Sequence, residues 1–284
     1  MLCGDALAQA AIQLRNEGVE SPRLDAELLL AHVLGANRAA ILTWPDRPLT
    51  PKQLTRYRDL LARRAAREPL AYIVGHREFY DLDFVVDARA LIPRPETELL
   101  VEHAVRTARR IAPQVGIPLR LADVGAGSGA IAVTLAVHLP EATIYALDDS
   151  AEALTLTAQN ARRHRVADRV RPLQGDLLSP LPQPVDLITA NLPYVATAEW
   201  DQLPPEIRVH EPRAALDGGS EGLTIIRRLL AMAGAYLRPG GALLLEIGAS
   251  QGAAVTALAR QHFPQADVQV HQDLAGLDRL VLIV

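Results

Sequence analysis

Apolar residues recur at three- and four-residue spacing through the first part of the chain. This spacing predicts helices in "DALAQAAIQL", "SPRLDAELLLAHVLG" and "TPKQLTRYRDLLARRAARE". Ser21-Pro22 and Thr50-Pro51 each place a capping hydroxyl before a proline at the first helical position, where the missing N–H of proline is not needed. Residues 1–68 are therefore predicted to form a small N-terminal helical bundle.

The pattern changes after Pro69. Aromatic and β-branched residues in "AYIVGHREFYDLDFVVD" predict a hairpin, and we assign residues 69–90 to a hairpin linker. Beyond it, in residues 91–284, a helix is expected from about Pro95. Strand-like apolar runs then alternate with helical stretches; they are "RLADV" (120–124), "TIYALD" (143–148), "VRPLQ" (170–174), "VDLITA" (185–190), "GALLLEIG" (241–248), "ADVQVHQ" and "DRLVLIV".

This alternation predicts an α/β fold with a mostly parallel, seven-stranded sheet covered by helices on both faces. The last two runs are joined only by "DLAGL". Because that connection is too short for a crossover helix, the last strand is predicted to be antiparallel.

Polar residues follow the predicted parallel strands where each strand ends. "DVGAGSGAI" holds Asp123 and a glycine loop with the spacing G-x-G-x-G, which differs from the dinucleotide G-x-G-x-x-G. Asp148 closes the second strand, where an acid can bind ribose hydroxyls, and Asp176 follows the third. Each acid alone could equally be a helix cap or a solvated strand end. Together they fit a nucleoside ligand that carries an amino-acid tail and no diphosphate.

Another polar segment, Asn191-Leu192-Pro193-Tyr194, ends the run "VDLITA". Pro193 cannot donate to a sheet, so the strand must stop there in a stiff turn. An amide or aromatic amine is a poor nucleophile, and the Asn191 side-chain oxygen with the carbonyl of Leu192 could orient its NH₂ group while Tyr194 packs on its face. Catalysis would then be mainly positioning. The alternative is a turn with a packed tyrosine.

The glycine loop and the three acids resemble those of class I S-adenosylmethionine-dependent methyltransferases, which have a Rossmann-like fold. The resemblance implies S-adenosyl-L-methionine as cofactor, with Asp123 near its methionine part, Asp148 on the ribose, and Asp176 and Leu177 flanking adenine. The residues expected to bind the cofactor through the loop are Gly125, Ala126, Gly127, Ser128 and Gly129. The tetrad resembles the [DNS]-P-P-[YF] motif of amino-methyltransferases, from which Leu192 departs; a leucine there is typical of ribosomal-RNA adenine dimethyltransferases.

Three flanking segments resemble the HemK/PrmC family, the N5-glutamine methyltransferases of peptide chain release factors. They are "LIPRPETELLVE" (91–102), "HEPRAALDGGSEGL" (210–223) and "LRPGGALLLEIG" (237–248). The resemblance implies methylation of the glutamine in the Gly-Gly-Gln loop of bacterial class-one release factors, docked by the N-terminal helical domain. It further implies that Arg94, Thr97, Glu98 and Asn191 line the cofactor site, and that Glu211, Pro212 and Arg213 join the tetrad on the substrate side. Glu96, Thr97 and Glu98 could instead simply start a helix with favourable charge.

Composition limits the other functions that the chain could have. No apolar run reaches 18 residues and no signal peptide is indicated, so we expect a cytoplasmic protein without a membrane segment. A single cysteine, Cys3, excludes internal disulfides, and no His or Cys pattern indicates a metal site. The net charge of −4 argues against wrapping nucleic acid non-specifically, although it leaves room for a local basic patch, and no direct sequence-specific nucleic-acid binding is expected. A monomer is expected.

Two alternatives remain open. An RNA or DNA adenine N6-methyltransferase is favoured by Asn191-Leu192, but the chain has no long basic or aromatic target-recognition segment. A non-catalytic S-adenosylmethionine-binding protein would not need the tetrad. Arginines cluster in "TRYRDLLARRAARE", either as a solvated helix face or as a partner-binding surface.

Overall fold

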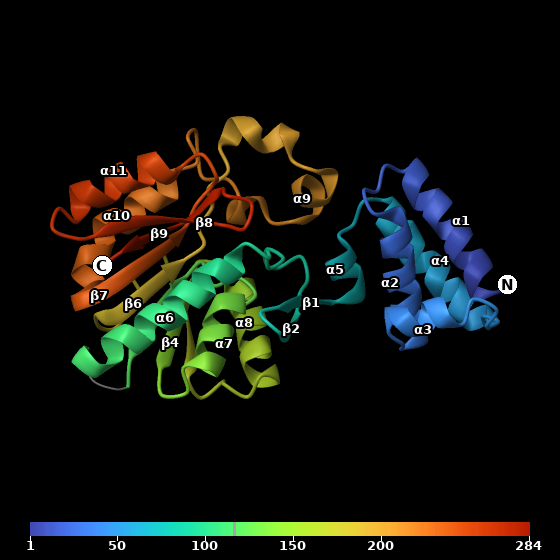
Figure 1. Cartoon of the computed structure of the whole chain (residues 1–284), viewed down its shortest axis with the longest axis horizontal. Coiled ribbons are helices and arrows are strands. Elements are labelled where there is room, and N and C mark those ends of the chain that lie inside the picture. Colours follow the sequence, from blue (N-terminus) through green and yellow to red (C-terminus); the bar gives the residue numbers. More distant parts are fainter. Residues whose placement is uncertain (116–117) are drawn as a thin grey trace. The chain divides into compact units, whose positions relative to one another are not determined.

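The computed structural model describes residues 1–115 and 118–284. They divide into two compact units, one formed by Met1–His76 with Pro204–His210 and the other by Arg77–Leu203 with Glu211–Val284. Helices make up the first unit, and a sheet with flanking helices makes up the second (Figure 1). Within the described residues, no helix combines the length and the apolar character that crossing a membrane requires.

Five helices form the N-terminal part of the first unit. They are α1 (Cys3–Asn16), α2 (Pro22–Leu34), α3 (Arg38–Thr43), α4 (Pro51–Ala65) and α5 (Leu70–Val74). Thr50 begins α4 with a capping box, in which its side chain accepts from the Gln53 N–H while the Gln53 side chain accepts from the Thr50 N–H. Leu29, Leu30 and Leu60 are fully buried between these helices, and each contributes about 1.5–3 kcal/mol through burial. The predicted helical bundle is confirmed.

The segment from Pro69 to Gly75 differs from the expected hairpin. It forms α5, because Pro69 precedes the helix and Gly75, with φ +83°, ends it in the left-handed conformation. The hairpin begins only at His76, with strands β1 (His76–Phe79) and β2 (Leu82–Val85). Tyr80 and Asp81 both have positive φ, as the two central residues of a tight hairpin turn require.

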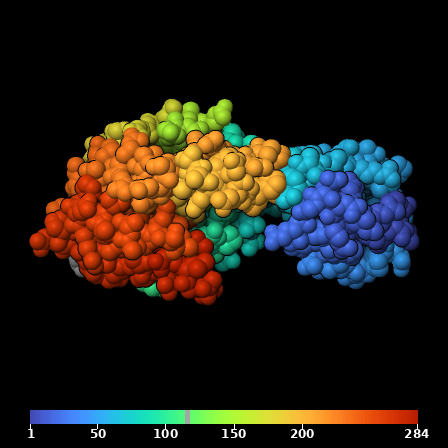
Figure 2. Space-filling model, turned by 90° about the horizontal axis from the view of Figure 1, so that it is seen from above, coloured from blue at the N-terminus to red at the C-terminus, as the bar shows by residue number. Residues whose placement is uncertain are grey.

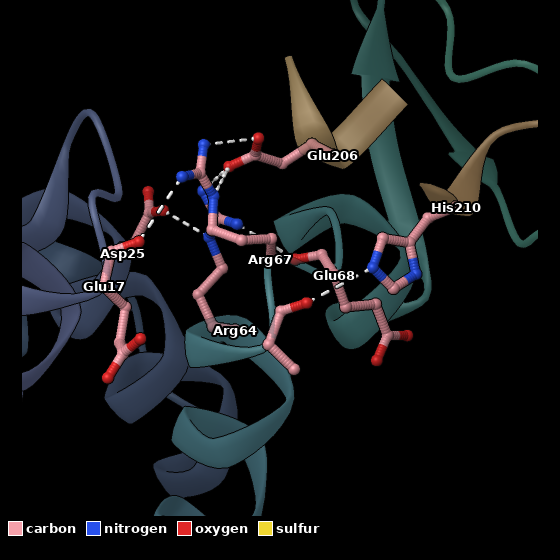
Figure 3. Close-up of polar contacts among 8 residues, drawn as sticks. Glu17, Asp25, Arg64, Arg67, Glu68, Glu206 and His210 are labelled. Carbon is pink, nitrogen blue, oxygen red and sulfur yellow. Dashed lines mark hydrogen bonds and ion pairs between the residues drawn. The ribbon is translucent and has the colours of Figure 1, made fainter. Parts of the chain in front are cut away.

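The short segment Pro204–His210, which forms α9 (Pro205–His210), belongs to the first unit although it lies far along the chain. Glu206 accepts hydrogen bonds from Arg67 Nε at 2.7 Å and Nη2 at 2.6 Å, and from Arg64 Nη2 at 3.0 Å (Figure 3). Arg64 also donates from Nε to Asp25 Oδ2 at 2.7 Å and is only 6% exposed. Neither a solvated helix face nor a partner surface describes these two arginines, because internal ion pairs hold them.

The second unit contains a seven-stranded sheet in the order β5-β4-β3-β6-β7-β9-β8. Its strands are β3 (Arg120–Val124), β4 (Thr143–Asp148), β5 (Val170–Gln174), β6 (Val185–Ala190), β7 (Leu237–Glu246), β8 (Val268–Gln272) and β9 (Asp278–Ile283). Strands β3 to β7 are parallel, whereas β9 pairs antiparallel with both β7 and β8. The predicted sheet and its antiparallel last strand are confirmed.

Helices cover both faces of this sheet (Figure 1). One face carries α6 (Thr97–Val115), α7 (Ala130–His138) and α8 (Ala151–Arg163), and the other carries α10 (Thr224–Tyr236) and α11 (Gly252–His262). Short 3₁₀ helices occur at Thr197–Gln202 and Arg213–Ala215. The C-terminal part of the chain is red in Figure 2 and lies at the surface of this unit. It includes β8, which is an edge strand of the sheet.

Candidate functional site

The site lies where the order of the parallel strands reverses. From β3 the chain continues to β4 on one side, whereas β6 pairs on the other side of β3, so the segments after β3 and β6 face one crevice. Gly125 has φ +78°, and a Cβ there would lie 3.1 Å from the Asn191 carbonyl oxygen and 3.3 Å from Leu192 Cδ2. The bare backbone of the glycine loop therefore packs directly on the tetrad.

The last glycine of the loop, Gly129, has a different role. Its φ is +82°, and a Cβ there would lie 3.0 Å from Thr157 Cγ2 on α8. Gly129 thus permits close packing of the start of α7 against α8, and it does not line the cavity described next.

A cavity of about 390 Å³ opens between the glycine loop, the ends of β4 and β5, and the tetrad. It brings together thirteen of the residues predicted for the site, namely Arg94, Thr97, Gly125, Ala126, Gly127, Ser128, Asp148, Asp176, Leu177, Asn191, Leu192, Pro193 and Pro212. Six others are absent from its wall: Glu98, Asp123, Gly129, Tyr194, Glu211 and Arg213.

Asp148, at the end of β4, connects the cavity wall to the glycine loop. Its Oδ2 accepts from the Gly127 N–H and its Oδ1 from the Ser150 N–H, both at 2.9 Å. Burial raises the pKa of Asp148, and the two backbone donors partly offset that rise by stabilising the carboxylate. Each oxygen keeps acceptor capacity for a ligand hydroxyl. Asp176 lines the same cavity and forms an ion pair with Arg228.

Asp123, the acid before the glycine loop, faces into the protein. It is fully buried; Oδ1 accepts from the Thr189 hydroxyl and Oδ2 from the Ala132 N–H, both at 3.1 Å. Burial raises its pKa to about 7 despite these two donors. In this structure Asp123 joins β3, β6 and the start of α7, and so positions the loop without reaching the cavity.

The tetrad begins directly after β6, all of whose residues are buried. The Asn191 side-chain Nδ2 donates to Thr97 Oγ1 at 3.2 Å, which leaves the Asn191 Oδ1 as an acceptor. The Leu192 side chain is buried in the apolar core beneath the sheet edge. Leu192 can therefore contribute to the cavity chiefly through its backbone.

Tyr194 does not line the cavity that Asn191 and Pro193 help to form. Its hydroxyl donates to Glu246 Oε1 at 3.4 Å, and its carbonyl accepts from Gln251 Nε2 at 2.9 Å. Burial raises the pKa of the Tyr194 hydroxyl, and the negative charge of Glu246 raises it further. Backbone hydrogen bonds from Val195 to Leu216 and from Gly218 to Val195 hold the chain just beyond it.

Glu211, Arg213 and Glu98 support neighbouring segments and do not line the cavity. Glu211 is buried, accepts from Arg94 Nη2 at 2.6 Å and also accepts from the Ile92 N–H at 3.2 Å. It thereby holds the cavity wall that Arg94 forms. Arg213 pairs with Asp217, and Glu98 accepts from the Tyr80 N–H at 3.0 Å, which ties the hairpin turn to α6.

One polar residue beside the tetrad escaped the sequence reasoning. Glu246 ends β7, next to the end of β6 in the sheet, because Leu245 pairs with Ala190. Its carboxyl is buried and contacts the Tyr194 hydroxyl. The signal was an acid closing the apolar run "ALLLE", the same pattern that identified Asp123 and Asp148.

Comparisons with known proteins agree on one family. Residues 5–75 match the PrmC N-terminal domain, and residues 97–218 match the methyltransferase small domain. The release factor glutamine methyltransferase of Geobacter sulfurreducens is 45% identical over 270 residues, covering 94% of this chain and 91% of that protein. The protein of the same name from Moorella thermoacetica is 45% identical over 283 residues, covering 99% and 98%. A methyltransferase structure from Pyrococcus furiosus has a TM-score of 0.52 at 15% identity, covering 79% and 97%, and supports the fold alone.

Proposed function

Because the chain belongs to the release factor glutamine methyltransferase family, we propose that it methylates the side-chain amide nitrogen (N5) of a glutamine. The methyl donor is S-adenosyl-L-methionine, and the acceptor is the glutamine of the Gly-Gly-Gln motif in bacterial class-one peptide chain release factors. One observation carries the proposal: Asn191, Leu192 and Pro193 line the same cavity as the glycine loop and Asp148. An amide-binding group and a nucleoside-binding group therefore share one space.

The cavity residues fit this cofactor. Gly125 and Gly127 present bare backbone, Asp148 can accept from ribose hydroxyls, and Asp176 with Leu177 forms the wall expected beside adenine. A volume of about 390 Å³ lies within the range of small-molecule sites. When bound, the cofactor supplies an electrophilic methyl group on a positively charged sulfur.

The tetrad has the groups needed to orient a glutamine amide. Asn191 Oδ1 and the Leu192 carbonyl can each accept one N–H of the substrate amide, and the Tyr194 ring can pack against its plane. Holding the nitrogen in line for attack accounts for most of the rate gain, since effective molarities from positioning alone reach about 10⁵–10⁸ M. The amide can release its proton late, so a strong general base is not required.

The helical unit is proposed to dock the release factor. Support comes from the match of residues 5–75 to the PrmC N-terminal domain and from apolar side chains exposed on this unit, Leu24, Leu42 and Trp44, the last 57% exposed. Trp44→Ala should raise KM for the intact release factor while leaving KM for a short Gly-Gly-Gln peptide unchanged. Equal effects on both substrates would argue against docking by this surface.

The direct test is mass spectrometry of a release factor incubated with the protein and S-adenosyl-L-methionine. One added methyl group on the Gly-Gly-Gln glutamine is expected. A release factor with that glutamine changed to asparagine should give none, and the Asn191→Ala enzyme should act at least about 10²-fold more slowly. A ribosomal-RNA adenine substrate belongs in the same assay, because Leu192 is the residue that favours an adenine methyltransferase. Transfer only to the RNA would replace the proposed function by that alternative.

A further inference from the structure

Glu246 is a buried carboxyl whose surroundings do not satisfy it. It is 2% exposed, and Oε2 has no aligned hydrogen-bond partner among the residues that the structure describes. Among the described residues, Oε1 accepts one long hydrogen bond, from the Tyr194 hydroxyl at 3.4 Å. Burying a carboxyl with so few partners is unfavourable, so its presence at the end of β7 needs an explanation.

The Thr97 hydroxyl connects this carboxyl to the tetrad. Thr97 is buried, and its Oγ1 accepts from Asn191 Nδ2 at 3.2 Å. Hydrogen bonding from the Thr97 hydroxyl lowers the pKa of Glu246, and the pairing of Ala190 with Leu245 places the next residues, Asn191 and Glu246, side by side at the edge of the sheet. Glu246, Thr97 and Asn191 thus form a chain of polar groups that ends at the predicted substrate amide.

The hydrogens available to these three polar groups determine which way the Asn191 amide faces. Thr97 has a single hydroxyl hydrogen, and an ionised carboxylate can only accept. While Glu246 is charged, the Thr97 hydrogen points towards it, and Thr97 Oγ1 is left to accept from the NH₂ group of Asn191. A Thr97 hydrogen directed at Asn191 would instead bind the amide oxygen and occupy the acceptor that the substrate needs.

We propose that Glu246 is a positioning residue for methyl transfer, acting through Thr97 to keep the side-chain oxygen of Asn191 facing the substrate amide. Glu246 also accepts from the Tyr194 hydroxyl, at 3.4 Å, and so fixes the position of the last residue of the tetrad. This inference rests on the proposed glutamine methylation and assigns to that site a residue outside the tetrad.

The charge of Glu246 should show in the pH dependence of the rate. The groups around it are Thr97 on α6, Glu96 just before that helix, the Tyr194 hydroxyl, and Arg279 on β9. Burial raises the pKa of Glu246 to about 7, the charge of Glu96 raises it too, and Thr97, Tyr194 and Arg279 lower it. Above about pH 7 the carboxylate can only accept, so it keeps the Thr97 hydrogen directed towards it. As the pH falls through 7, the protonated carboxyl gains an O–H that can itself donate to Thr97 Oγ1, and this constraint is lost.

The test is single-turnover methylation of a release factor by Glu246→Gln, measured from pH 6 to 9. A glutamine keeps the shape but adds an NH₂ donor, so the rate should fall by at least about tenfold above pH 7, with the dissociation constant of S-adenosyl-L-methionine within about twofold. The variant should also lose the part of the pH dependence that Glu246 causes. Any dependence due to Asp123, whose pKa is also about 7, should remain in both proteins.

Two further comparisons separate positioning from folding. Thr97→Ser, which keeps the hydroxyl, should be at least about tenfold faster than Thr97→Val. Glu102→Gln is the control for a Glu→Gln change as such. Glu102 lies on α6, like Thr97, but pairs with Arg106 at the surface. If the wild type methylates release factor but Glu246→Gln matches it at every pH, the role of Glu246 is excluded. The same follows if rate, cofactor affinity and unfolding midpoint fall together with an unchanged pH profile. If the wild type itself does not act on release factor, the proposed function fails instead.

Discussion

Glu206 provides the sharpest stability prediction, because one carboxylate holds α9 in the helical unit. Both of its oxygens accept from Arg67, and Oε1 also accepts from Arg64 (Figure 3). In Glu206→Gln, Arg64 would keep Asp25 as its partner, at 2.7 Å. Arg67 would keep the Glu17 carbonyl, at 3.4 Å, and one neutral amide oxygen in place of two carboxylate oxygens, while its own φ of +66° remains strained. The charge on Arg67 would therefore lose its main partner.

The size of the effect follows from the pKa of Glu206. Burial alone would raise this pKa, but hydrogen bonds from Arg67 and Arg64 outweigh burial and lower it from 4.5 to about 2. This lowering of the pKa, by about 2.5, corresponds to at most about 3.4 kcal/mol of stabilisation of the folded state at neutral pH. Because water reaches part of the cluster and screens it, we expect Glu206→Gln to reduce the free energy of unfolding by about 1–2 kcal/mol.

Urea unfolding at pH 7 and pH 3 provides the measurement. The stabilisation from a lowered pKa is complete above about pH 4.5 and is lost as the pH falls towards 2, so the difference between wild type and variant should shrink by roughly half at pH 3. Hydrogen exchange should become faster in residues 204–210. Glu221→Gln is the control, since Glu221 forms an exposed pair with Arg227 that should contribute less than about 1 kcal/mol. A Glu206 variant no less stable than this control, or a stability difference independent of pH, would show that the Glu206 ion pairs do not stabilise the helical unit.

Four other substitutions test the site. Asp148→Ala should weaken S-adenosyl-L-methionine binding by about 1.5–3 kcal/mol, measured by calorimetry, through loss of a charge-assisted acceptor; unchanged affinity would remove Asp148 from the site. Gly129→Ala should lower the free energy of unfolding by about 1–3 kcal/mol, because φ is +82° and Thr157 lies 3.0 Å from the new Cβ, and a denaturation curve equal to wild type would contradict this. Leu192→Pro should keep the single-turnover rate within about tenfold, whereas Asn191→Ala should lower it by about 10²-fold or more. Loss of activity in Leu192→Pro would show that residue 192 does more than present its carbonyl.

Local sequence determined most of the sheet. The strands at 120–124, 143–148, 170–174 and 185–190 have the predicted bounds, because parallel strands covered on both faces read as continuous apolar runs ended by polar or glycine residues. The same logic placed the glycine loop, Asp148 and Asn191 at one edge, since parallel strands all point their carboxyl ends the same way. Short helices were harder to predict. Helix α3 has six residues and one buried side chain, Ile41, which leaves little periodicity to detect.

Tertiary structure decided what the polar residues at that edge do. Asp123 and Asp148 look alike in sequence, yet Asp123 is enclosed by Thr189 and Ala132 while Asp148 lines the cavity. Glu206 joins Arg64 and Arg67 across more than 130 positions of the chain, and Glu246 meets Tyr194 only because β6 and β7 pair. Sequence pattern reports which residues prefer burial and where an element ends, because these depend on neighbours within a few positions. Hydrogen-bond partners and the direction of a carboxylate depend on contacts between distant segments, and those exist only in the folded chain.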